Sequence, residues 1–304
     1  MFELPPVTET EIFARIPNDD TAGPIDPEWT AGQLPIAPPR GVLEGPSFDL
    51  DGNLYCVDIP RGHIYRVAPD GNAELFLHYD GWPCGLKIHK DGTIYLTDAK
   101  HGLMKLDPKT RRVEQLVTRY NMERFKGVND LFFARNGDIY FTDQGTTGLH
   151  NPTGRLFRLT ASGELTCLLD NVPSPNGLVM NVDETVVYLA VTRGNCIWRV
   201  PLLRNGLPSK VGMFIQMTGG WGPDGLALDE KGRLVVTHVG LGVVWVFDPS
   251  GAPVYRIKAR EGSHVTNVAY GGPNGTTLFI TESHSSTVQF VELDTPGKAM
   301  YSHQ

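Results

Sequence analysis

The sequence predicts an all-β protein, a six-bladed β-propeller with four antiparallel strands in each blade. Three observations lead to this prediction. Helical periodicity is nearly absent from the chain of 304 residues, and short alternating apolar runs end in DG, NG or KG turns. One sequence unit recurs six times along the chain. The copies follow one another at about the 40 to 50 residues that a four-stranded propeller blade needs.

Each unit opens with a strand, a tight turn and a second strand. In the fifth unit Leu226, Leu228, Leu234 and Val236 alternate with other residues around the turn at Lys231-Gly232. The copies start 40, 45, 47, 48 and 42 residues apart, at Glu44, Cys84, Asn129, Asn176, Asp224 and Thr266. A third strand such as "GHIYRVAP" or "GRLFRLTA" follows most copies, and a more polar fourth strand often follows it.

The last unit lacks a fourth strand of its own. The N-terminal stretch TEIFARIP (residues 10–17) has the alternation to supply it, which would close the ring and make residues 1–304 a single domain. Only residues 119–125 have a pattern that allows a short helical turn. Two longer connections, 18–41 and 144–154, join strands at the end of the ring where we expect the active site. We expect them either to form a lid or set the size of the mouth, or to be plain surface loops.

Composition excludes several classes of protein. The formal net charge of −7 argues against nucleic acid and against an anionic membrane surface as partners. Four widely spaced cysteines without a CxxC pair suggest neither a zinc site nor a disulfide framework. The N-terminus lacks the pattern of a secretory signal, and no apolar run approaches the ~18 residues of a membrane span. We therefore expect a soluble cytoplasmic protein, a monomer or a small homo-oligomer.

The first residue of the repeat differs chemically from copy to copy, and we call these positions the first column. If the position served only the turn, the same kind of residue would recur in every blade. Because the innermost strands surround one axis, the six side chains should converge at one end of the channel. Converging oxygen ligands suit a divalent cation such as Ca²⁺, Mg²⁺ or Mn²⁺. The first column is Glu44, Cys84, Asn129, Asn176, Asp224 and Thr266.

A second column lies at the end of the second strand, fourteen residues further on in four of the copies. Because the two strands are antiparallel, both columns should lie at the same mouth, where gathered acids repel one another unless a cation intervenes. Each residue alone also has a plain structural explanation, as an Asx turn, a loop cap or a satisfied histidine. The second column is Asp58, Asp98, Asp143, Val191, His238 and Glu282.

At these positions the sequence resembles the SMP-30/gluconolactonase/LRE-like family of six-bladed propeller lactonases. The motifs that carry the resemblance are "EGP" at 44–46, "VNDLFF" at 128–133, "FTDQG" at 141–145, "SPNGLVM" at 174–180 and "GPDGLALD" at 222–229. The resemblance implies that Glu44, Asn176 and Asp224 bind one divalent cation and that Asn129 lies at the metal or the substrate. It also implies that Asp224 is the general base and that Asp143 lies near the lactone. Where relatives often carry Arg or another polar residue, this chain has Cys84.

These residues lead to a hypothesis of metal-assisted lactone hydrolysis. Ca²⁺ is the first choice of cation, with Mg²⁺, Mn²⁺, Zn²⁺ or Fe²⁺ as alternatives, and the substrate is a sugar aldonolactone or another small lactone. Asp224 or Asp143 would take a proton from the attacking water. The predicted substrate contacts are Asn129, His238, Cys84, Trp82 and Trp221. The alternatives are a metal-free, strictosidine-synthase-like enzyme or another non-lactonase propeller enzyme, and a non-catalytic ligand-binding propeller.

Overall fold

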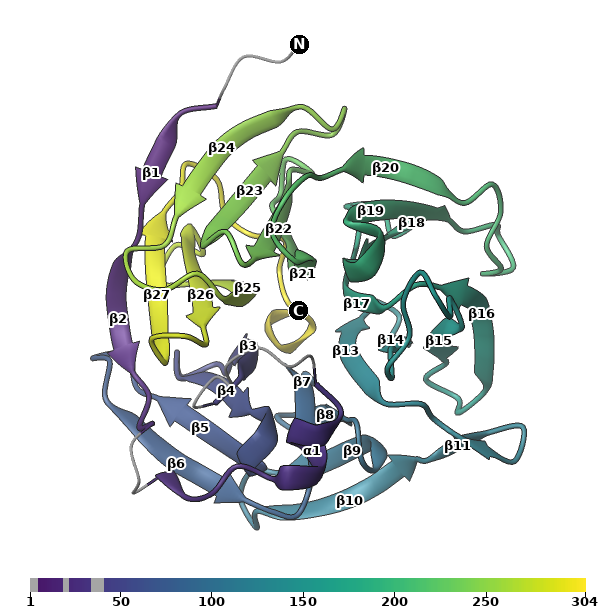
Figure 1. The fold of residues 1–304 in the computed structure, drawn as a ribbon, viewed down its shortest axis with the longest axis horizontal. Coiled ribbons are helices and arrows are strands. Elements are labelled where there is room, and N and C mark those ends of the chain that lie inside the picture. Colours follow the sequence, from purple (N-terminus) through teal and green to yellow (C-terminus); the bar gives the residue numbers. More distant parts are fainter. Residues whose placement is uncertain (1–4, 19–21, 34–40) are drawn as a thin grey trace.

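Six blades, each with four antiparallel strands, surround a central axis, and the sheet of one blade has a fifth strand (Figure 1). The computed structural model describes residues 5–18, 22–33 and 41–304. The predicted six-bladed β-propeller is confirmed. Inner strands of neighbouring blades contact one another around the axis, so whatever side chains they carry at one end are gathered into one place.

The first three blades each use four consecutive long strands. Blade 1 consists of β3 (Leu43–Phe48), β4 (Leu54–Asp58), β5 (His63–Val67) and β6 (Ala73–His78). Blade 2 consists of β7 (Pro83–Ile88), β8 (Ile94–Asp98), β9 (Gly102–Asp107) and β10 (Arg112–Val117). Blade 3 consists of β13 (Val128–Phe133), β14 (Ile139–Asp143), β15 (Gly154–Leu159) and β16 (Leu165–Val172).

Blades 4 and 5 follow the same plan, and blade 6 has three strands from the C-terminal part of the chain. Blade 4 consists of β17 (Pro175–Met180), β18 (Val186–Val191), β19 (Cys196–Pro201) and β20 (Gly212–Gln216). Blade 5 consists of β21 (Gly222–Leu228), β22 (Leu234–Val239), β23 (Val243–Phe247) and β24 (Pro253–Lys258). Blade 6 contains β25 (Val265–Gly271), β26 (Thr277–Glu282) and β27 (Thr287–Glu292).

The N-terminal strands close the ring, as predicted. Strand β2 (Glu11–Arg15) lies antiparallel to β27 and is the fourth strand of blade 6. Strand β1 (Val7–Glu9) runs parallel to β24 and adds a fifth strand to blade 5. The N-terminus therefore binds the two C-terminal blades together, which joins the ends of the circle (Figure 1).

The prediction of a helical turn at 119–125 was wrong. These residues form a short hairpin of β11 (Arg119–Tyr120) and β12 (Glu123–Arg124). Asn121 and Met122 at its tip both have positive φ angles, 47° and 68°. Two consecutive residues with positive φ are what the tightest β-hairpin turn requires, and this conformation excludes a right-handed helix.

The hydrophobic core is divided among the blade interfaces. In the described part of the chain each of six apolar clusters lies between two adjacent blades. Between blades 2 and 3, for example, the fully buried rings of Phe141 and Phe157 stack with centroids 5.2 Å apart. The axis itself is left free for polar side chains.

The C-terminal residues lie at the far end of the inner strands. In the short 3-10 helix η4 (Tyr301–His303), the Tyr301 ring stacks on Phe133 with centroids 5.1 Å apart. The Ser302 hydroxyl donates to the carbonyl of Phe48, and both Phe48 and Phe133 end their inner strands. The first column lies at the opposite end, so the tail and the cavity described next are at opposite ends of the channel.

The remaining helices are short. They are α1 (Pro27–Ala31) and the 3-10 turns η2 (Ile59–Arg61) and η3 (Thr192–Gly194). Among the described residues no helix is long and apolar enough to cross a membrane.

Candidate functional site

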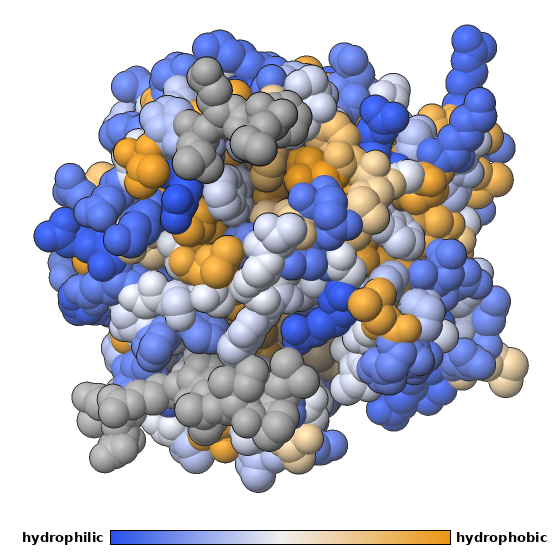
Figure 2. Space-filling model, turned by 45° about the horizontal axis from the view of Figure 1, so that its top comes forward, coloured by the Kyte–Doolittle hydropathy of each residue, from blue (hydrophilic) through white to orange (hydrophobic). Residues whose placement is uncertain are grey.

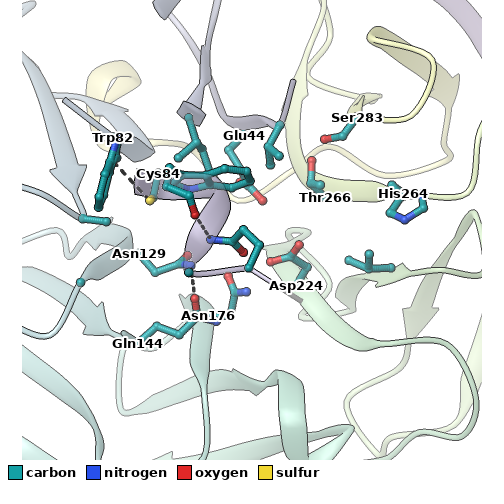
Figure 3. A pocket seen from close by; sticks show the side chains of 18 of the residues that line it. Glu44, Trp82, Cys84, Asn129, Gln144, Asn176, Asp224, His264, Thr266 and Ser283 are labelled. Atoms are coloured by element: carbon teal, nitrogen blue, oxygen red, sulfur yellow. Dashed lines mark hydrogen bonds between the residues drawn. The ribbon is translucent and has the colours of Figure 1, made fainter. Parts of the chain in front are cut away.

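All six residues of the first column line one cavity of about 1330 Å³ at the mouth of the ring. The space-filling view shows apolar surface in the middle of a face whose rim is mostly hydrophilic (Figure 2). In the close view Glu44, Asn129, Asn176, Asp224 and Thr266 surround the centre of the cavity, and Cys84 lies to one side beside Trp82 (Figure 3). The structure thus brings together residues separated by up to 222 positions in the chain.

A β-bulge in the inner strand of every blade lies at these side chains. In blade 3, Val128 is opposite Asp143 but Leu131 is opposite Phe141, so the inner strand contains one extra residue between these pairs. The same irregularity occurs at the first column in the other five blades. A bulge bends a strand and redirects its side chains. It lets two consecutive residues, such as Asn129 and Asp130, face the channel together.

Three buried carboxyl groups lie close together in and beneath the first column. Burial and the charges of Asp224 and Asp130 raise the pKa of Glu44 well above its usual value. Burial and the charge of Asp130 raise the pKa of Asp224 from 3.8 to about 8. Burial also raises the pKa of Asp130. Without a cation, these carboxyl groups therefore resist ionisation. Burial removes each of them from water, and a negative charge on one would repel a negative charge on the next.

Two residues one layer deeper were missed by the sequence analysis. We call Asp130 and Asn267 the inner pair. The Asn267 Nδ2 donates to Glu44 Oε2 at 2.8 Å and to Asp130 Oδ2 at 3.3 Å, so it ties two of the three acids together. A Cβ on Gly225 would lie 2.2 Å from Asn267 Oδ1, so only glycine leaves room there. The signal was present in the repeat: the position after the first column is glycine in four copies and Asp130 or Asn267 in the other two.

The two amides of the first column are held in defined orientations. Asn129 Nδ2 donates to Gln144 Oε1 at 2.8 Å, and Gln144 Nε2 donates to Ser174 Oγ at 2.9 Å. This relay leaves the Asn129 Oδ1 as an acceptor for a ligand. Asn176 lies beside Asp224 and opposes part of the rise in the pKa of that carboxyl. Gln144, like the inner pair, was not among the predicted site residues.

The four acids of the second column do not line the cavity. They bind backbone N–H groups at its rim instead. Each accepts a hydrogen bond from the backbone N–H two residues before the first column in its own blade. This bond fixes the loop that carries the first-column side chain, so these acids are positioning residues. The pairs are Val42 N to Asp58 at 2.9 Å, Trp82 N to Asp98 at 3.0 Å, Gly127 N to Asp143 at 2.9 Å and His264 N to Glu282 at 2.7 Å.

Asp143 therefore does not lie where a general base would have to lie. Its carboxylate is fully buried, accepts from the N–H of Gly127 and from Arg155 Nε at 2.8 Å, and is absent from the lining of the cavity. Burial raises the pKa of Asp143, and Arg155 offsets part of that effect. Because Asp143 does not line the cavity and both its oxygens already have hydrogen-bond partners, its carboxylate does not reach a substrate bound there.

His238 is also separated from the cavity, contrary to its predicted contact with substrate. Its Nε2 donates to the carbonyl of Gly219 at 2.9 Å, and its Nδ1 accepts from Trp245 Nε1 at 3.3 Å. Burial lowers the pKa of the imidazole. Both ring nitrogens are engaged, so this histidine is a structural residue of blade 5. The fifth second-column position, Val191, carries no polar group.

The other predicted substrate contacts do line the cavity. Cys84, Trp82 and Trp221 are all in its wall. Burial raises the pKa of the Cys84 thiol well above its usual value, and its Sγ lies 3.4 Å from the Trp82 carbonyl. Trp221 lies edge-on against His264, with ring centroids 4.7 Å apart. His264, Ser283 and Arg193 also line the cavity and were not predicted.

Both long connections reach the mouth. Of the 18–41 segment, residues 19–21 and 34–40 lie outside the described residues. The part at 22–33, which we call the mouth segment, contains α1 and contributes Glu28, Trp29 and Thr30 to the cavity. The 144–154 loop contributes Gln144, Gly145 and Thr146. Neither connection can therefore be regarded as a surface loop remote from the site.

The donor set is suited to a hard divalent cation. Two carboxylates and two amides converge in the first column, with a third carboxylate in the inner pair, and hard cations prefer oxygen ligands. In the described part of the chain, no cluster of three or more His, Cys, Asp and Glu side chains has metal-binding geometry. A cation bound here would consequently depend on amide oxygens as well as carboxylates. Positive charge at this point would relieve the repulsion among Glu44, Asp130 and Asp224.

Comparison with known proteins agrees with this geometry. The family model described as "SMP-30/Gluconolactonase/LRE-like region" matches residues 42–284. A gluconolactonase of Zymomonas mobilis is 32% identical over 276 residues, which are 80% of this chain and 76% of that protein. Lactonase drp35 of Staphylococcus aureus is 29% identical over 237 residues, 73% of this chain and 72% of that protein.

A solved structure shares the fold over the whole length. The crystal structure of regucalcin from Agrobacterium tumefaciens, described as a calcium-binding protein, superposes with a TM-score of 0.78 at 21% identity. The match covers 99% of this chain and 100% of regucalcin. The family match spans all six first-column positions and the inner pair. The chain belongs to the SMP-30/gluconolactonase/LRE-like family.

Proposed function

We propose that this protein hydrolyses the ester bond of a lactone with the help of one divalent cation bound at the first column. The observation that carries the proposal is the convergence of Glu44, Asn129, Asn176 and Asp224 on one cavity above a third buried acid, Asp130. Its support from the comparisons is the family match together with lactonase relatives at about 30% identity over most of the chain.

The residues that would hold the cation are Glu44, Asn176 and Asp224, with Asn129 as a fourth oxygen donor. Oxygen ligation of this kind favours Ca²⁺ and also admits Mg²⁺ or Mn²⁺, with Zn²⁺ and Fe²⁺ as further alternatives. A bound cation would polarise the ester carbonyl and stabilise the negative charge that develops on its oxygen.

Asp224 is the residue that we assign as general base. It lies in the cavity wall, whereas the other candidate, Asp143, is held by Arg155 and Gly127. Asp224 would accept a proton from water as the water oxygen forms a bond to the carbonyl carbon. When the carbon–oxygen bond of the ring breaks, that proton passes to the leaving alkoxide, and the product is a hydroxy acid. Asn176 also lines the cavity beside Asp224 and favours the ionised form of that carboxyl.

The test is the rate of acid release in a pH-stat from a panel of lactones that includes δ-gluconolactone and δ-valerolactone. We expect hydrolysis that EDTA abolishes and that added Ca²⁺ or Mn²⁺ restores. Asp224→Asn should lower kcat by about 100-fold or more, the scale of a lost general base. Asp143→Asn is the matched control. Assayed at a temperature where it is folded, this variant should retain most of the wild-type kcat. Full activity of Asp224→Asn would contradict the assignment of the base.

A further inference from the structure

The cavity has two chemically different sides. Next to blades 1 and 2 its wall is apolar and is formed by Trp29, Val42, Ile59, Trp82 and Ala99. Across the first column the wall contains more polar groups, with Thr192, Arg193, His264 and Ser283 beside Trp221 and Val239. The close view shows Trp82 and Cys84 on one side of Asp224, with His264 and Ser283 on the other (Figure 3). A substrate held at the first column therefore meets unlike surfaces at its two ends.

The apolar side is built with the mouth segment, which is fastened to blades 1 and 2 by specific bonds. Asp26 N donates to the carbonyl of Pro60 at 2.9 Å, and Arg61 Nε donates to the carbonyl of Gly23 at 3.0 Å. Arg61 also forms an ion pair with the second-column acid Asp58 at 2.7 Å. The same carboxylate that fixes the rim of blade 1 thus anchors, through Arg61, the segment that carries Trp29.

Asp26 couples the two tryptophans directly. One of its oxygens accepts from the N–H groups of Glu28 and Trp29 and so begins α1, at 2.8 and 3.4 Å. The other oxygen accepts from Trp82 Nε1 at 3.0 Å. Because Trp82 has its one polar group satisfied in this way, its ring can present an apolar face to the cavity. Trp29 packs against the same apolar cluster, so the wall is already formed without a ligand.

The size of the cavity also bears on the substrate. Pockets for drug-sized ligands span about 300 to 1,000 Å³, and this cavity has about 1330 Å³. An unsubstituted five- or six-membered lactone would leave much of it filled with water. Hydroxyl groups placed against Trp29, Val42 and Ile59 would lose their hydrogen bonds to water without replacement, which disfavours a polyhydroxylated ring on this side. An aryl or alkyl group there would instead be removed from water against aromatic rings.

We propose that Trp29 and Trp82 form a subsite for an apolar substituent, so that the substrates are lactones bearing an aryl or alkyl group. This inference rests on the proposed lactonase activity, because its kinetic test measures lactone hydrolysis. Trp29 and Trp82 are specificity-determining residues, and Asp26 is a positioning residue that sets the distance between them. The ester carbonyl lies at the first column, and the substituent extends over Cys84 toward the mouth segment.

The kinetic test compares kcat/KM for phenyl-substituted δ-valerolactone with that for unsubstituted δ-valerolactone and δ-gluconolactone. We expect the wild type to favour the phenyl lactone, and Trp29→Ala to lower that preference by about 10-fold or more, the scale of lost contacts in an apolar pocket. The loss should appear as a rise in KM for the phenyl lactone. Trp29→Phe should keep the preference, and Trp198→Phe, outside the cavity, should have no effect. Asp26→Asn should raise KM for the phenyl lactone only.

A binding test separates this inference from the proposed activity. The phenyl-substituted δ-lactam has the shape of the phenyl lactone but resists hydrolysis, and its binding can be followed by tryptophan fluorescence. We expect Kd to rise about 10-fold in Trp29→Ala, whether or not any lactone is hydrolysed. Lactone hydrolysis with a preference for δ-gluconolactone, or equal lactam binding by wild type and Trp29→Ala, would overturn the subsite. Trp29-dependent lactam binding without any lactone hydrolysis would support the subsite and contradict the proposed function alone.

Discussion

Replacing Asp224 by asparagine should make the metal-free protein more stable, although Asp224 is assigned as the base. The pKa of this carboxyl rises from 3.8 to about 8 on folding. At pH 7 the folded protein must therefore keep a proton on a group that is ionised in the unfolded chain. Each unit between 3.8 and 7 costs about 1.4 kcal/mol, so the penalty is about 4 kcal/mol. Asparagine removes this penalty but also changes the polar contact with Asn176, for which we subtract about 1 kcal/mol.

The assay is thermal and urea unfolding of the wild type and Asp224→Asn in EDTA and in excess Ca²⁺. In EDTA at pH 7 we expect the variant to gain about 2 to 3 kcal/mol, or about 5 °C in Tm. Because folded Asp224 binds its proton more tightly than the unfolded chain does, the contribution of Asp224 to wild-type stability falls as pH rises from about 4 to 8. The advantage of the variant should thus shrink toward pH 4. At 100 times Kd, Ca²⁺ should add about 2.7 kcal/mol to the wild type and much less to the variant.

Asp143→Asn is the control, because it replaces another buried acid, one that has a cationic partner. Its loss leaves Arg155 buried without a counter-charge, which should cost about 3 kcal/mol or more in EDTA and in Ca²⁺ alike. If Asp224→Asn is destabilised in EDTA as much as Asp143→Asn, repulsion among Glu44, Asp130 and Asp224 does not control the stability of the metal-free site. The reasoning about why this site needs a cation would then be wrong.

Three further predictions follow from other buried groups. Asp130→Asn should weaken divalent-cation binding by about 10-fold in a calorimetric titration, since it removes charge beneath the first column without removing a direct ligand; unchanged affinity would mean that the inner pair does not act on the cation. Burial and His78 lower the pKa of His63 from 6.5 to about 4, so the unfolded chain binds a proton at higher pH than the folded protein, and stability is lost as pH falls from about 6.5 to 4. His63→Gln should flatten this part of the stability profile, and an unchanged slope would assign it to other groups. Tyr301→Ala should cost about 3 kcal/mol in urea unfolding through loss of its stack on Phe133, yet leave KM unchanged because the tail lies opposite the cavity; a raised KM would show coupling between the two ends.

The first column could be predicted from the sequence because the six copies of the repeat can be compared position by position. Six copies share one backbone plan, so side chains that differ at the same position, such as Glu44, Asn176 and Asp224, had to be explained by something other than the turn. The closure of the ring by β2 was predictable for a related reason, since the sixth copy lacked one strand of the common unit.

The inner pair left a signal in the repeat, but strand alternation points away from the channel there, and the partners of the second column left no signal at all. Regular alternation places Asp130 on the opposite face from Asn129, and only the bulge turns both toward the channel. The second column does lie near the mouth, as expected, but its acids bind backbone N–H groups and arginines such as Arg155. These partners follow from three-dimensional geometry that sequence spacing alone does not contain. The hairpin at 119–125 depended likewise on two residues with positive φ that a propensity argument treats as ordinary.

The central claim is that the first column binds one divalent cation on which lactone hydrolysis depends. The most direct measurement is a titration of EDTA-stripped, dialysed protein with Ca²⁺ or Mn²⁺, with the rate of lactone hydrolysis and the bound metal per chain followed in the same samples. We predict that the stripped protein is inactive and that the rate rises in proportion to bound metal up to one ion per chain. Asn176→Ala should require a higher metal concentration to reach its plateau. Full hydrolysis by the stripped protein, with no metal bound, would contradict the account.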